Sequence, residues 1–561
     1  MSNNLRLYLW LALAILLWVN YTTWTGEFSA QTGPATPVSA PSQPPSLANR
    51  IPGGSTAPPP AAGGAPAVSP VVPSPAPGTA ASLSSSAPLI QVRTDVYDLE
   101  ISTEGGTLTR VDLLKYAEAT GKSARVRLEN TQPATEYLLQ TGLTGPAGQP
   151  HPTQAALYSA ARRSYRLDGA QQIRVPLTWS SGGVTVTKTF VFRRGSYRIG
   201  LEYTIENRGT SPWQAAEFAQ LFRNDPRTKA SYFQPSSRAY HGPAVWNGKE
   251  YVQLDPESSD YQHYQAQVTD GWIAVPQLDF VSAVVPRKGS TYRFTSQVSG
   301  SQYALSAVGP AHTVPPGATL NLSQSLYVGP TLHAQLEKTD PTLTYLAISG
   351  WFAILARPLF WLLSQVERLT GNWGVAIIVV TFLLKLVFYP LSEASGRSMA
   401  KMKALGPRIK NIQEMYKDDK EKLSRAMIEI YKREKVNPVS GCLPMILQLP
   451  VFIAFYWVLL YSVELRQAPF MFWIRDLSTR DPYFILPALM AVTGFLQFKL
   501  NPAPPDPVQA KVMMVMPIAM AALFAFFPSG LVLYYVVNSL LSIAQQWNIN
   551  RRIEAATRAR S

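Results

Sequence analysis

The chain has 561 residues, enough for several domains, and its 50 Lys and Arg outnumber its 35 Asp and Glu by 15. In a soluble protein this excess would indicate nucleic-acid binding. Here much of it lies beside apolar runs, where anionic lipid and membrane topology explain it better. A single cysteine, Cys442, excludes an internal disulfide and a cysteine-rich metal site, and the five histidines lack metal-site spacing. We expect no cofactor and no metal.

The amino-terminal residues predict a membrane anchor and a tether. Leu7–Val19 is an apolar run with aromatic residues after it, and no small-residue cleavage site follows. We therefore assign residues 1–27 to an uncleaved first span, with a signal peptide as the alternative. Residues 28–89 are dense in Pro, Ala, Gly and Ser, and their one charged residue is Arg50. They predict an extended linker, with a proline-rich docking site as the alternative.

Residues 90–340 predict a large antiparallel β-sandwich. Tyr197–Ile205 alternates apolar and polar residues, and Val184–Phe192 precedes it across an Arg-Arg-Gly-Ser turn, which predicts a hairpin. Further strand-like runs are Phe280–Val285, Tyr303–Val308 and Leu320–Val328. Trp246 and Trp272 are candidates for a sugar-binding cleft, although such aromatic residues lie more often in a core or at its rim.

The rest of the chain predicts a membrane domain. Residues 341–373 predict an amphipathic interfacial helix, because their apolar run contains Arg357, Glu367 and Arg368. Residues 374–550 hold five apolar runs, each long enough, or nearly so, to cross about 30 Å at about 1.5 Å per residue. These runs are Gly374–Leu391, Leu443–Val463, Pro482–Phe498, Val512–Pro528 and Gly530–Asn550. With the anchor they predict six transmembrane helices.

Basic residues predict the orientation of these spans, since they favour the cytoplasmic side. Arg6 precedes the first span, and the loop Arg397–Lys435 carries 12 Lys and Arg. The tail 551–561 is basic as well. Both termini are therefore expected in the cytoplasm and the β-domain in the periplasm, which predicts a multi-pass protein of a bacterial inner membrane.

The cytoplasmic segment 393–437 predicts two antiparallel helices with a methionine-rich seam. Apolar residues recur every three or four positions on both sides of a polar turn at residues 417–420; they are Met399, Met402, Leu405, Ile409, Ile412, Met415, Leu423, Met427 and Ile430. Gly406-Pro407 should kink or restart the first helix. The seam either only holds the pair together or offers an adaptable basic surface to polypeptide or ribosome.

Lys385 lies inside the first of the five apolar runs, where a charge costs a few kcal/mol or more. Because it is about five residues from the inner end, snorkelling is one explanation. A polar groove is another. Thr381 lies one turn earlier on the same face, Gln448 interrupts the next run, and Tyr535 belongs to the last run. Ordinary interhelical hydrogen bonding also explains such residues. A groove without acidic residues would attract an anionic group.

Several stretches resemble the YidC family of membrane protein insertases. They cover nearly all of residues 370–550 in order: GNWGVAIIVVTFLLKLVFYPL, SMAKMKALGPRI, YKREKVNPVSGCLPMILQLPVF, SVELRQAPF and FPSGLVLYYVVNSLLSIAQQ. The anchor, the linker and the β-domain match the Gram-negative bacterial layout more loosely. The resemblance implies a β-domain like the supersandwich of sugar mutarotases, without catalysis.

The resemblance also implies a hydrophilic, cytoplasm-facing groove formed by the five carboxyl-side spans. Lys385 falls on the position of the family's basic groove residue, where arginine is usual, so the chain departs from the pattern. Thr381, Gln448 and Tyr535 align with groove-facing positions and are the other candidate substrate-binding residues. The chain beyond Asn550 is short, which leaves the helical pair as the expected recruitment surface.

We therefore expect an insertase and chaperone, not an enzyme, that inserts, folds and assembles inner-membrane proteins alone or with the Sec translocon. By resemblance its partners are nascent membrane proteins, the Sec translocon, the ribosome and the lipid bilayer, with no specific nucleic-acid binding. One alternative is a secondary transporter or channel, which the lack of Asp and Glu in the spans disfavours. The other is a membrane-anchored periplasmic carbohydrate-acting protein, which the number of spans disfavours.

Overall fold

The computed structural model describes residues 47–50, 87–118, 123–225, 242–256, 258–262, 264–277, 279–348, 353–416, 419–434, 443–500 and 507–558. The predicted first span and most of the linker lie outside these residues. The described chain forms two compact units. A β-unit contains the described parts of Pro44–Pro358 together with Trp457–Ser478, and a helical unit contains those of Leu359–Tyr456 and Thr479–Ser561.

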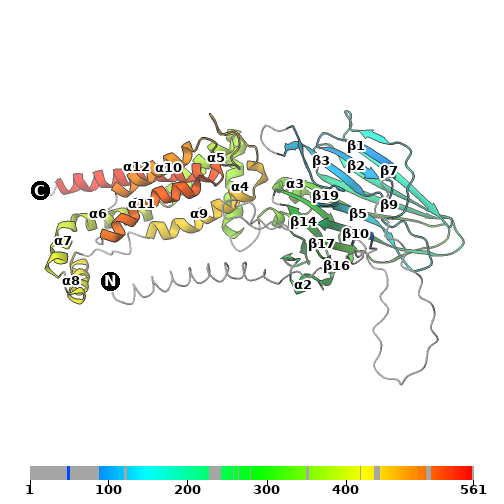
Figure 1. Ribbon diagram of the computed structural model, residues 1–561, viewed down its shortest axis with the longest axis horizontal. Helices are drawn as coiled ribbons and strands as arrows, with labels where there is room; N and C mark the ends of the chain where they lie inside the picture. Colours follow the sequence, from blue (N-terminus) through cyan, green and yellow to red (C-terminus); the bar gives the residue numbers. More distant parts are fainter. Residues whose placement is uncertain are drawn as a thin grey trace, which may run out of the picture. The chain divides into compact units, whose positions relative to one another are not determined.

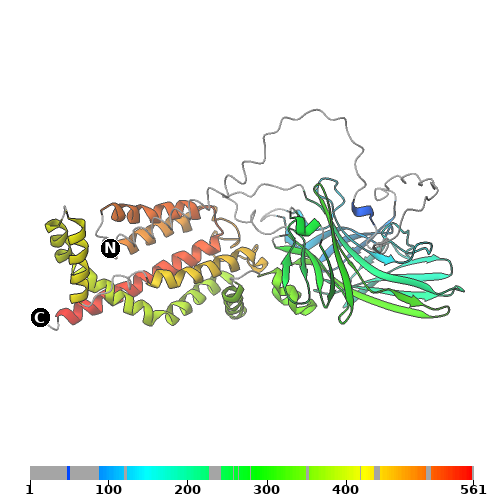
Figure 2. The ribbon, with the colours of Figure 1, turned by 90° about the horizontal axis from the view of Figure 1, so that it is seen from below.

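The β-unit is built from two β-sheets (Figures 1 and 2). The strands of the larger sheet are β1 (Leu89–Arg93), β2 (Tyr97–Ser102), β3 (Leu108–Ala117), β4 (Arg125–Arg127), β5 (Tyr137–Thr144), β6 (Ser164–Arg166), β10 (Trp213–Asn224), β13 (Gln265–Thr269), β16 (Thr291–Ser299), β17 (Gln302–Val308) and β18 (His312–Val314). Among the described residues this sheet has 11 strands, in the order β13-β16-β17-β10-β5-β3-β2-β1-β6, with β18 beside β10 and β4 beside β3.

The smaller sheet completes the sandwich. Its strands are β7 (Gln172–Ser181), β8 (Val184–Arg193), β9 (Arg198–Asn207), β11 (Ala244–Trp246), β12 (Tyr251–Gln253), β14 (Trp272–Gln277), β15 (Phe280–Val285) and β19 (Thr319–Pro330), in the order β12-β11-β14-β15-β19-β9-β8-β7. The sheets pack face to face: Tyr97 Oη of the larger sheet lies 2.9 Å from the Tyr197 carbonyl beside β9, and Tyr137 Oη lies 3.2 Å from the Val275 carbonyl of β14.

The predicted hairpin is present. β8 and β9 pair antiparallel with Phe192 opposite Ile199, and buried residues alternate along β9. The prediction of a wholly antiparallel sandwich is wrong at one edge, because β1 and β6 run parallel with Gln91 opposite Ser164. Residues 94–163 separate β1 from β6 in the chain, and a long connection of this kind allows parallel pairing.

Trp246 and Trp272 occupy core and rim positions. Trp272 is 1% exposed, and its Nε1 donates a hydrogen bond to Thr342 Oγ1 at 2.8 Å. Trp246 is half-buried and stacks on Tyr345, with ring centroids 5.1 Å apart. The ordinary explanation for both residues therefore fits the structure better than a sugar-binding cleft.

A short 3-10 helix, η1 (Leu47–Asn49), docks on the β-unit inside the segment predicted as an extended linker. Leu47 and Ala48 are buried with residues of β5, β10 and β17, namely Leu138, Phe222 and Ala304. The Leu47 amide donates to Gln302 Oε1 at 3.2 Å. The linker prediction is wrong for these residues, because two small apolar side chains fill a slot in the sandwich. So short a segment carries no detectable periodicity.

Glu129 and Glu217 are buried carboxyl groups of the β-unit. Glu129 is 0% exposed and accepts a hydrogen bond from Ser282 Oγ at 2.5 Å, and Glu217 is 3% exposed and accepts one from Tyr292 Oη. Within the described part of the chain, the second carboxyl oxygen of each has no partner. Burial raises the pKa of both Glu129 and Glu217 to about 7.

These raised pKa values predict that the β-unit is more stable at pH 5 than at pH 8. Between the ordinary glutamate pKa of 4.5 and about 7, the folded chain holds more protons than the unfolded chain. The unfolding free energy therefore falls as pH rises through this window, by at most about 3 kcal/mol for each carboxyl. The check is the melting temperature of the full-length protein in neutral detergent across this range. Glu217→Gln should weaken the dependence, whereas Glu250→Gln, on the exposed surface, should leave it unchanged.

Short helices lie within the β-unit, and longer helices follow it in the chain. The short helices are α2 (Ser259–Gln262), α3 (His333–Thr339), η3 (Pro341–Leu346) and η5 (Val463–Leu465). The longer ones are α4 (Ala353–Thr370), α5 (Trp373–Val387), α6 (Tyr389–Ala404), α7 (Gly406–Met415), α8 (Lys420–Arg433), α9 (Leu443–Tyr461), α10 (Ile485–Leu500), α11 (Pro507–Phe524) and α12 (Ser529–Arg558). The predicted interfacial helix corresponds to α4.

The predicted run 374–391 is divided between two helices, α5 and α6, which meet at an angle of 63°. Pro390, the second residue of α6, has no amide hydrogen, and its ring disfavours a continuous helix. Judged by length and apolar composition, the described helices include none that would cross a membrane alone, and α5 with Tyr389–Ser398 passes only as a bent pair. The other four runs correspond to α9, α10, α11 and α12, and the count of six spans remains a prediction.

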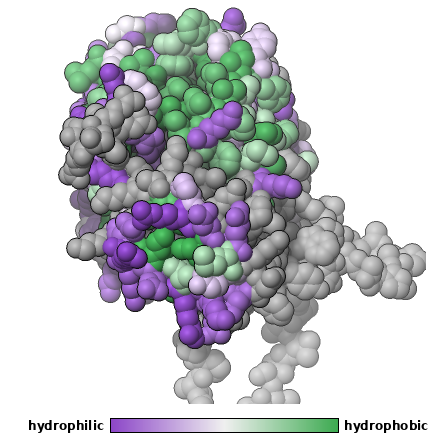
Figure 3. Space-filling model, turned by 90° about the vertical axis from the view of Figure 1, so that its left-hand side faces the viewer, coloured by the Kyte–Doolittle hydropathy of each residue, from purple (hydrophilic) through white to green (hydrophobic). Residues whose placement is uncertain are grey.

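The predicted helical pair is formed by α7 and α8. α6 ends before Gly406 and α7 begins there, so the predicted restart is confirmed. Arg408 Nη1 donates to Glu434 Oε1 at 2.8 Å and links the two helices. The seam is only partly closed, because Met415 is 71% exposed. Figure 3 looks at the side on which α7 and α8 lie and shows hydrophilic side chains gathered around an apolar patch.

Candidate functional site

A groove of about 480 Å³ lies in the helical unit between α5, α6, α9 and α12. All four predicted site residues line it: Lys385 and Thr381 from α5, Gln448 from α9 and Tyr535 from α12. Further polar residues of its wall are Ser392, Ser395, Gln497, Asn538, Ser539, Ser542, Gln545 and Gln546. The structure thus brings together side chains that lie up to 165 positions apart in the sequence.

Lys385 reaches across the groove to α12. Its Nζ donates a hydrogen bond to Ser542 Oγ at 2.8 Å, and Ser542 Oγ in turn donates to the Asn538 carbonyl at 2.7 Å. The lysine is half-buried, and it has no carboxylate partner among the described residues. This chain of hydrogen bonds holds the amine inside the groove in this structure.

The other predicted residues form different parts of the wall. Thr381 is 1% exposed, and its hydroxyl donates to the Ile377 carbonyl at 2.6 Å, so its hydrogen is used within α5. Gln448 and Tyr535 are half-buried. Beside Tyr535, Tyr534 stacks on Phe455 of α9 with ring centroids 4.2 Å apart, which fixes α9 against α12.

The lining of the groove, as far as the structure describes it, contains one charged residue, Lys385, and no Asp or Glu. Its remaining wall is apolar, with Leu391, Leu449, Val451, Phe452 and Met520 among the residues. Gln545 Nε2 is buried there without a hydrogen-bond partner. Such a surface suits a flexible polar segment that brings hydrogen-bond acceptors and negative charge.

We next considered whether the side chains of this lining could carry out covalent catalysis. The described residues include no group of three or more His, Cys, Asp or Glu that could hold a metal ion. The hydroxyls of Thr381 and Ser542 donate to carbonyls of their own helices, and Ser542 Oγ also accepts from Lys385 Nζ. The arrangement can therefore bind and orient a segment of polypeptide.

Sequence reasoning missed the contribution of α6 to the groove. Ser392, Ser395 and Gly396 line it beyond the bend. Gly396 lets α6 approach α12 closely, because a Cβ there would lie 2.8 Å from Ile549 Cδ1. The signal was present in the sequence, since Lys385, Ser392 and Ser395 share a spacing that continues one helical face.

Comparisons with known proteins cover almost the whole chain. A family model described as "60Kd inner membrane protein" matches residues 365–556, and another described as "YidC periplasmic domain" matches residues 89–362. A protein of Pseudomonas putida (strain W619) named "Membrane protein insertase YidC" is 41% identical over 555 residues, 98% of each chain. One of the same name from Thioalkalivibrio sulfidiphilus is 41% identical over 567 residues, 99% of each chain.

A solved structure also matches. It is titled "Active YidC insertase crystal structure with the first transmembrane domain resolved" and is 19% identical in sequence. The match covers 82% of this chain and 94% of that chain, with a TM-score of 0.37.

Proposed function

Because the chain belongs to the YidC family of membrane protein insertases of Gram-negative bacteria, we propose that the groove lined by Lys385 receives the polar translocated segment of its substrates. The chain is a membrane protein insertase of the inner membrane with a periplasmic domain. Its relatives are insertases and not enzymes, so the transporter and carbohydrate-enzyme alternatives are set aside. The substrates are newly made membrane proteins, and the bilayer is their destination.

The observation that carries the proposal is the single positive charge in a groove lining without carboxylates. An acidic tail that enters from the cytoplasm approaches Lys385, while the polar side chains of α12 replace part of its lost hydration. Two opposite unit charges about 6 Å apart attract by about 3 kcal/mol at an effective dielectric constant near 20. Lys385, Thr381, Gln448 and Tyr535 bind and orient the segment, and no covalent bond is made.

The driving force comes from the apolar segment of the substrate. Burial of about 20 apolar residues in lipid, at roughly 25 cal/mol per Å², outweighs the cost of moving a short polar tail through a groove that shortens the apolar barrier. The apolar segment would leave past α9 and α11, whose exposed side chains include Leu449, Val512 and Met516. This path requires no nucleotide.

The proposed topology has six spans, with both termini in the cytoplasm and the β-domain in the periplasm. Its support is the loop after α9, which is part of the β-unit: Arg466 Nη1 lies 2.8 Å from Asp279 Oδ2. Trp457–Tyr461, the carboxyl end of α9, also belongs to the β-unit. The proposed division is 1–27 anchor, 28–89 linker except for the docked residues 47–49, 90–340 β-domain, 341–373 interfacial helix, 374–550 core and 551–561 tail.

We further propose that the α7–α8 pair recruits partners on the cytoplasmic side. It combines exposed basic residues such as Arg425 with the exposed apolar Met415 and Ile428. A ribosome offers the negative charge, and an emerging polypeptide offers the apolar contact. Joint insertion with the Sec translocon belongs to the same proposal. No specific binding of nucleic-acid sequence is proposed.

Lys385→Glu is expected to lower insertion of a single-span substrate with an acidic translocated tail about tenfold or more, because reversal turns the attraction into repulsion. The measurement is protease protection of that tail in liposomes that contain only this protein. Lys499→Glu is the matched control, since Lys499 ends α10 outside the groove lining and contacts Phe495. Lys385→Arg should retain insertion.

Three outcomes separate the possibilities. Equal insertion by wild type and Lys385→Glu would leave the insertase assignment in place and remove the role of the groove charge. Equal loss in Lys385→Glu and Lys499→Glu would assign the effect to net charge. No insertion by wild type above empty liposomes would contradict autonomous insertion and favour an accessory role beside the translocon.

A further inference from the structure

A second hollow, outside the groove, lies on the outer face of the smaller sheet of the β-unit. Four strands, β15, β19, β9 and β8, lie side by side, and Val285, Ser325, Gly200 and Val191 are direct partners across them. Gly200 contributes no side chain, so the sheet is open at this point. The resulting cavity has a volume of about 460 Å³.

Basic side chains surround this hollow. Arg193 ends β8, Arg198 begins β9, and Arg287 and Lys288 follow β15. Arg198 Nε donates to Ser325 Oγ at 3.0 Å, which leaves the two terminal nitrogens of its guanidinium for another acceptor. Burial, followed by the nearby charge of Arg193, lowers the pKa of Arg198 from its ordinary value. The two arginines therefore repel one another at the edge of the hollow.

The nearby carboxylates are already engaged. Glu202, which also lines the hollow, pairs with Arg174. Asp340 accepts from Thr342, and its other oxygen lies 3.4 Å from Lys288 Nζ. Asp95 accepts from the amide of the turn between β8 and β9. Among the described residues, neither Arg193 nor Arg198 has a carboxylate partner.

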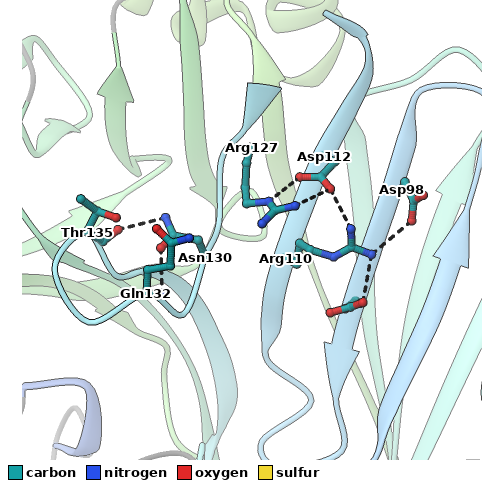
Figure 4. A network of polar contacts seen from close by, with 8 residues as sticks. Asp98, Arg110, Asp112, Arg127, Asn130, Gln132 and Thr135 are labelled. Carbon is teal, nitrogen blue, oxygen red and sulfur yellow. Dashed lines mark hydrogen bonds and ion pairs between the residues drawn. The ribbon is translucent and has the colours of Figure 1, made fainter. Parts of the chain in front are cut away.

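In the larger sheet of the same domain, arginine side chains form ion pairs with carboxylates. Arg110 lies 2.9 Å from Glu100, 2.8 Å from Asp112 and 3.5 Å from Asp98, and Arg127 Nε lies 2.7 Å from Asp112 (Figure 4). Both arginines of that network therefore have carboxylate partners from the protein itself. Arg193 and Arg198 at the hollow have no such carboxylate partner among the described residues, so an external anion could neutralise their charge.

We propose that this hollow binds a phosphate group, either on the headgroup of an anionic phospholipid or as the free ion. Two guanidinium forks match phosphate oxygens, and the hydroxyls of Ser196, Ser323 and Ser325 at the hollow add donors. Thr339 also lines the hollow, and 14 positions later the chain enters α4, the predicted interfacial helix. This continuity favours a lipid headgroup. The site goes beyond the insertion function, and only its lipid form rests on the proposed topology.

The test compares two probes on the full-length protein in a neutral detergent: inorganic phosphate and dihexanoyl phosphatidylglycerol, with dihexanoyl phosphatidylcholine as a neutral-headgroup reference. The double variant R193Q/R198Q should weaken binding of the anionic probe about tenfold or more, measured by isothermal titration calorimetry. R162Q/R163Q removes the same charge from exposed positions elsewhere in the β-unit and should change binding less than twofold. Equal melting temperatures of the variants establish that each is folded.

The binding results distinguish a lipid site from a phosphate site and test whether Arg193 and Arg198 form either. Variant-sensitive binding of phosphatidylglycerol without phosphate assigns the site to lipid, and comparable binding of both probes assigns it to the phosphate group itself. The proposal is overturned if R193Q/R198Q binds both probes as wild type does, or if R162Q/R163Q loses as much. Wild-type insertion activity in liposomes is a separate measurement, so failure here leaves the groove mechanism untouched.

Discussion

Lys188→Met is expected to lower the unfolding free energy of the β-unit by several kcal/mol, about 3 or more. Lys188 belongs to β8 and is 0% exposed, yet its amine is fully hydrogen-bonded. Nζ donates to the carbonyls of Gly105 at 2.7 Å, Gly106 at 3.0 Å and Thr141 at 2.8 Å. All three acceptors belong to the larger sheet and its β2–β3 turn, so the amine joins the two sheets.

The cost arises because methionine fills the space but leaves three buried carbonyls without their donor. Each lost partner costs about 1–3 kcal/mol when the orphaned group stays buried. The turn is also shaped around the lysine: Gly105 and Gly106 have φ values of 69° and 58°, which turn their carbonyls toward Nζ. A Cβ on Gly106 would lie 3.0 Å from Nζ, so side chains at this turn compete with the amine.

The measurement is the melting temperature of the full-length protein together with hydrogen exchange of peptides from β5 and from the β2–β3 turn. Lys115→Met is the matched control, because Lys115 is exposed on β3 in the same unit. We expect the control to stay within about 0.5 kcal/mol of wild type. If Lys188→Met melted with the control, the three carbonyl bonds would contribute nothing net.

The β8–β9 hairpin and the groove show what could be predicted from the sequence. Alternating residues specify β9 because one face is buried, and the short turn fixes its partner. The groove could be predicted because Lys385, Gln448 and Tyr535 interrupt apolar runs. Polar residues are costly inside a membrane and usually have a structural or functional role there. The resemblance to a family aligned these positions, and the structure places them in one cavity.

Other features depend on contacts that no local pattern specifies. The buried Lys188 takes an inward position of β8 between Val186 and Phe190, and only the turn at Gly105 explains why a lysine is stable there. The docking of Leu47 depends on a slot formed by residues of three distant strands. The bend before Pro390 was within reach of the sequence, because proline disfavours a continuous helix.

Arg466→Ala is expected to release the loop after α9 from the β-unit. Arg466 makes several contacts at once: Nη1 lies 2.8 Å from Asp279 Oδ2, and Nη2 donates to the Glu118 carbonyl at 3.0 Å. The guanidinium also lies over the Phe280 ring, 5.3 Å from its centroid. Both charged side chains are largely buried, at 21% and 11% exposure, so the pair is poorly screened by solvent.

Neighbouring residues strengthen this attachment. Gln467 Nε2 donates to the Ala117 carbonyl at 2.9 Å, and Glu464 Oε1 accepts from the His333 amide at 3.1 Å. The loop therefore holds the end of β3, the start of β15 and the amino end of α3 together. Removing Arg466 leaves the charge of Asp279 in a largely buried place, which costs about 2–3 kcal/mol.

The expected result is amide exchange about 30-fold faster or more in peptides covering 463–468 and 113–118, measured on the full-length protein by hydrogen exchange mass spectrometry. Arg466→Lys keeps the charge but loses the fork, so we expect an intermediate rate. Arg174→Ala removes an ion pair to Glu202 that is about half exposed, and its effect should stay within about 1 kcal/mol. Equal exchange in Arg466→Ala and wild type would contradict the attachment and would leave the α9 loop positioned by apolar packing of Val463 and Leu465 alone.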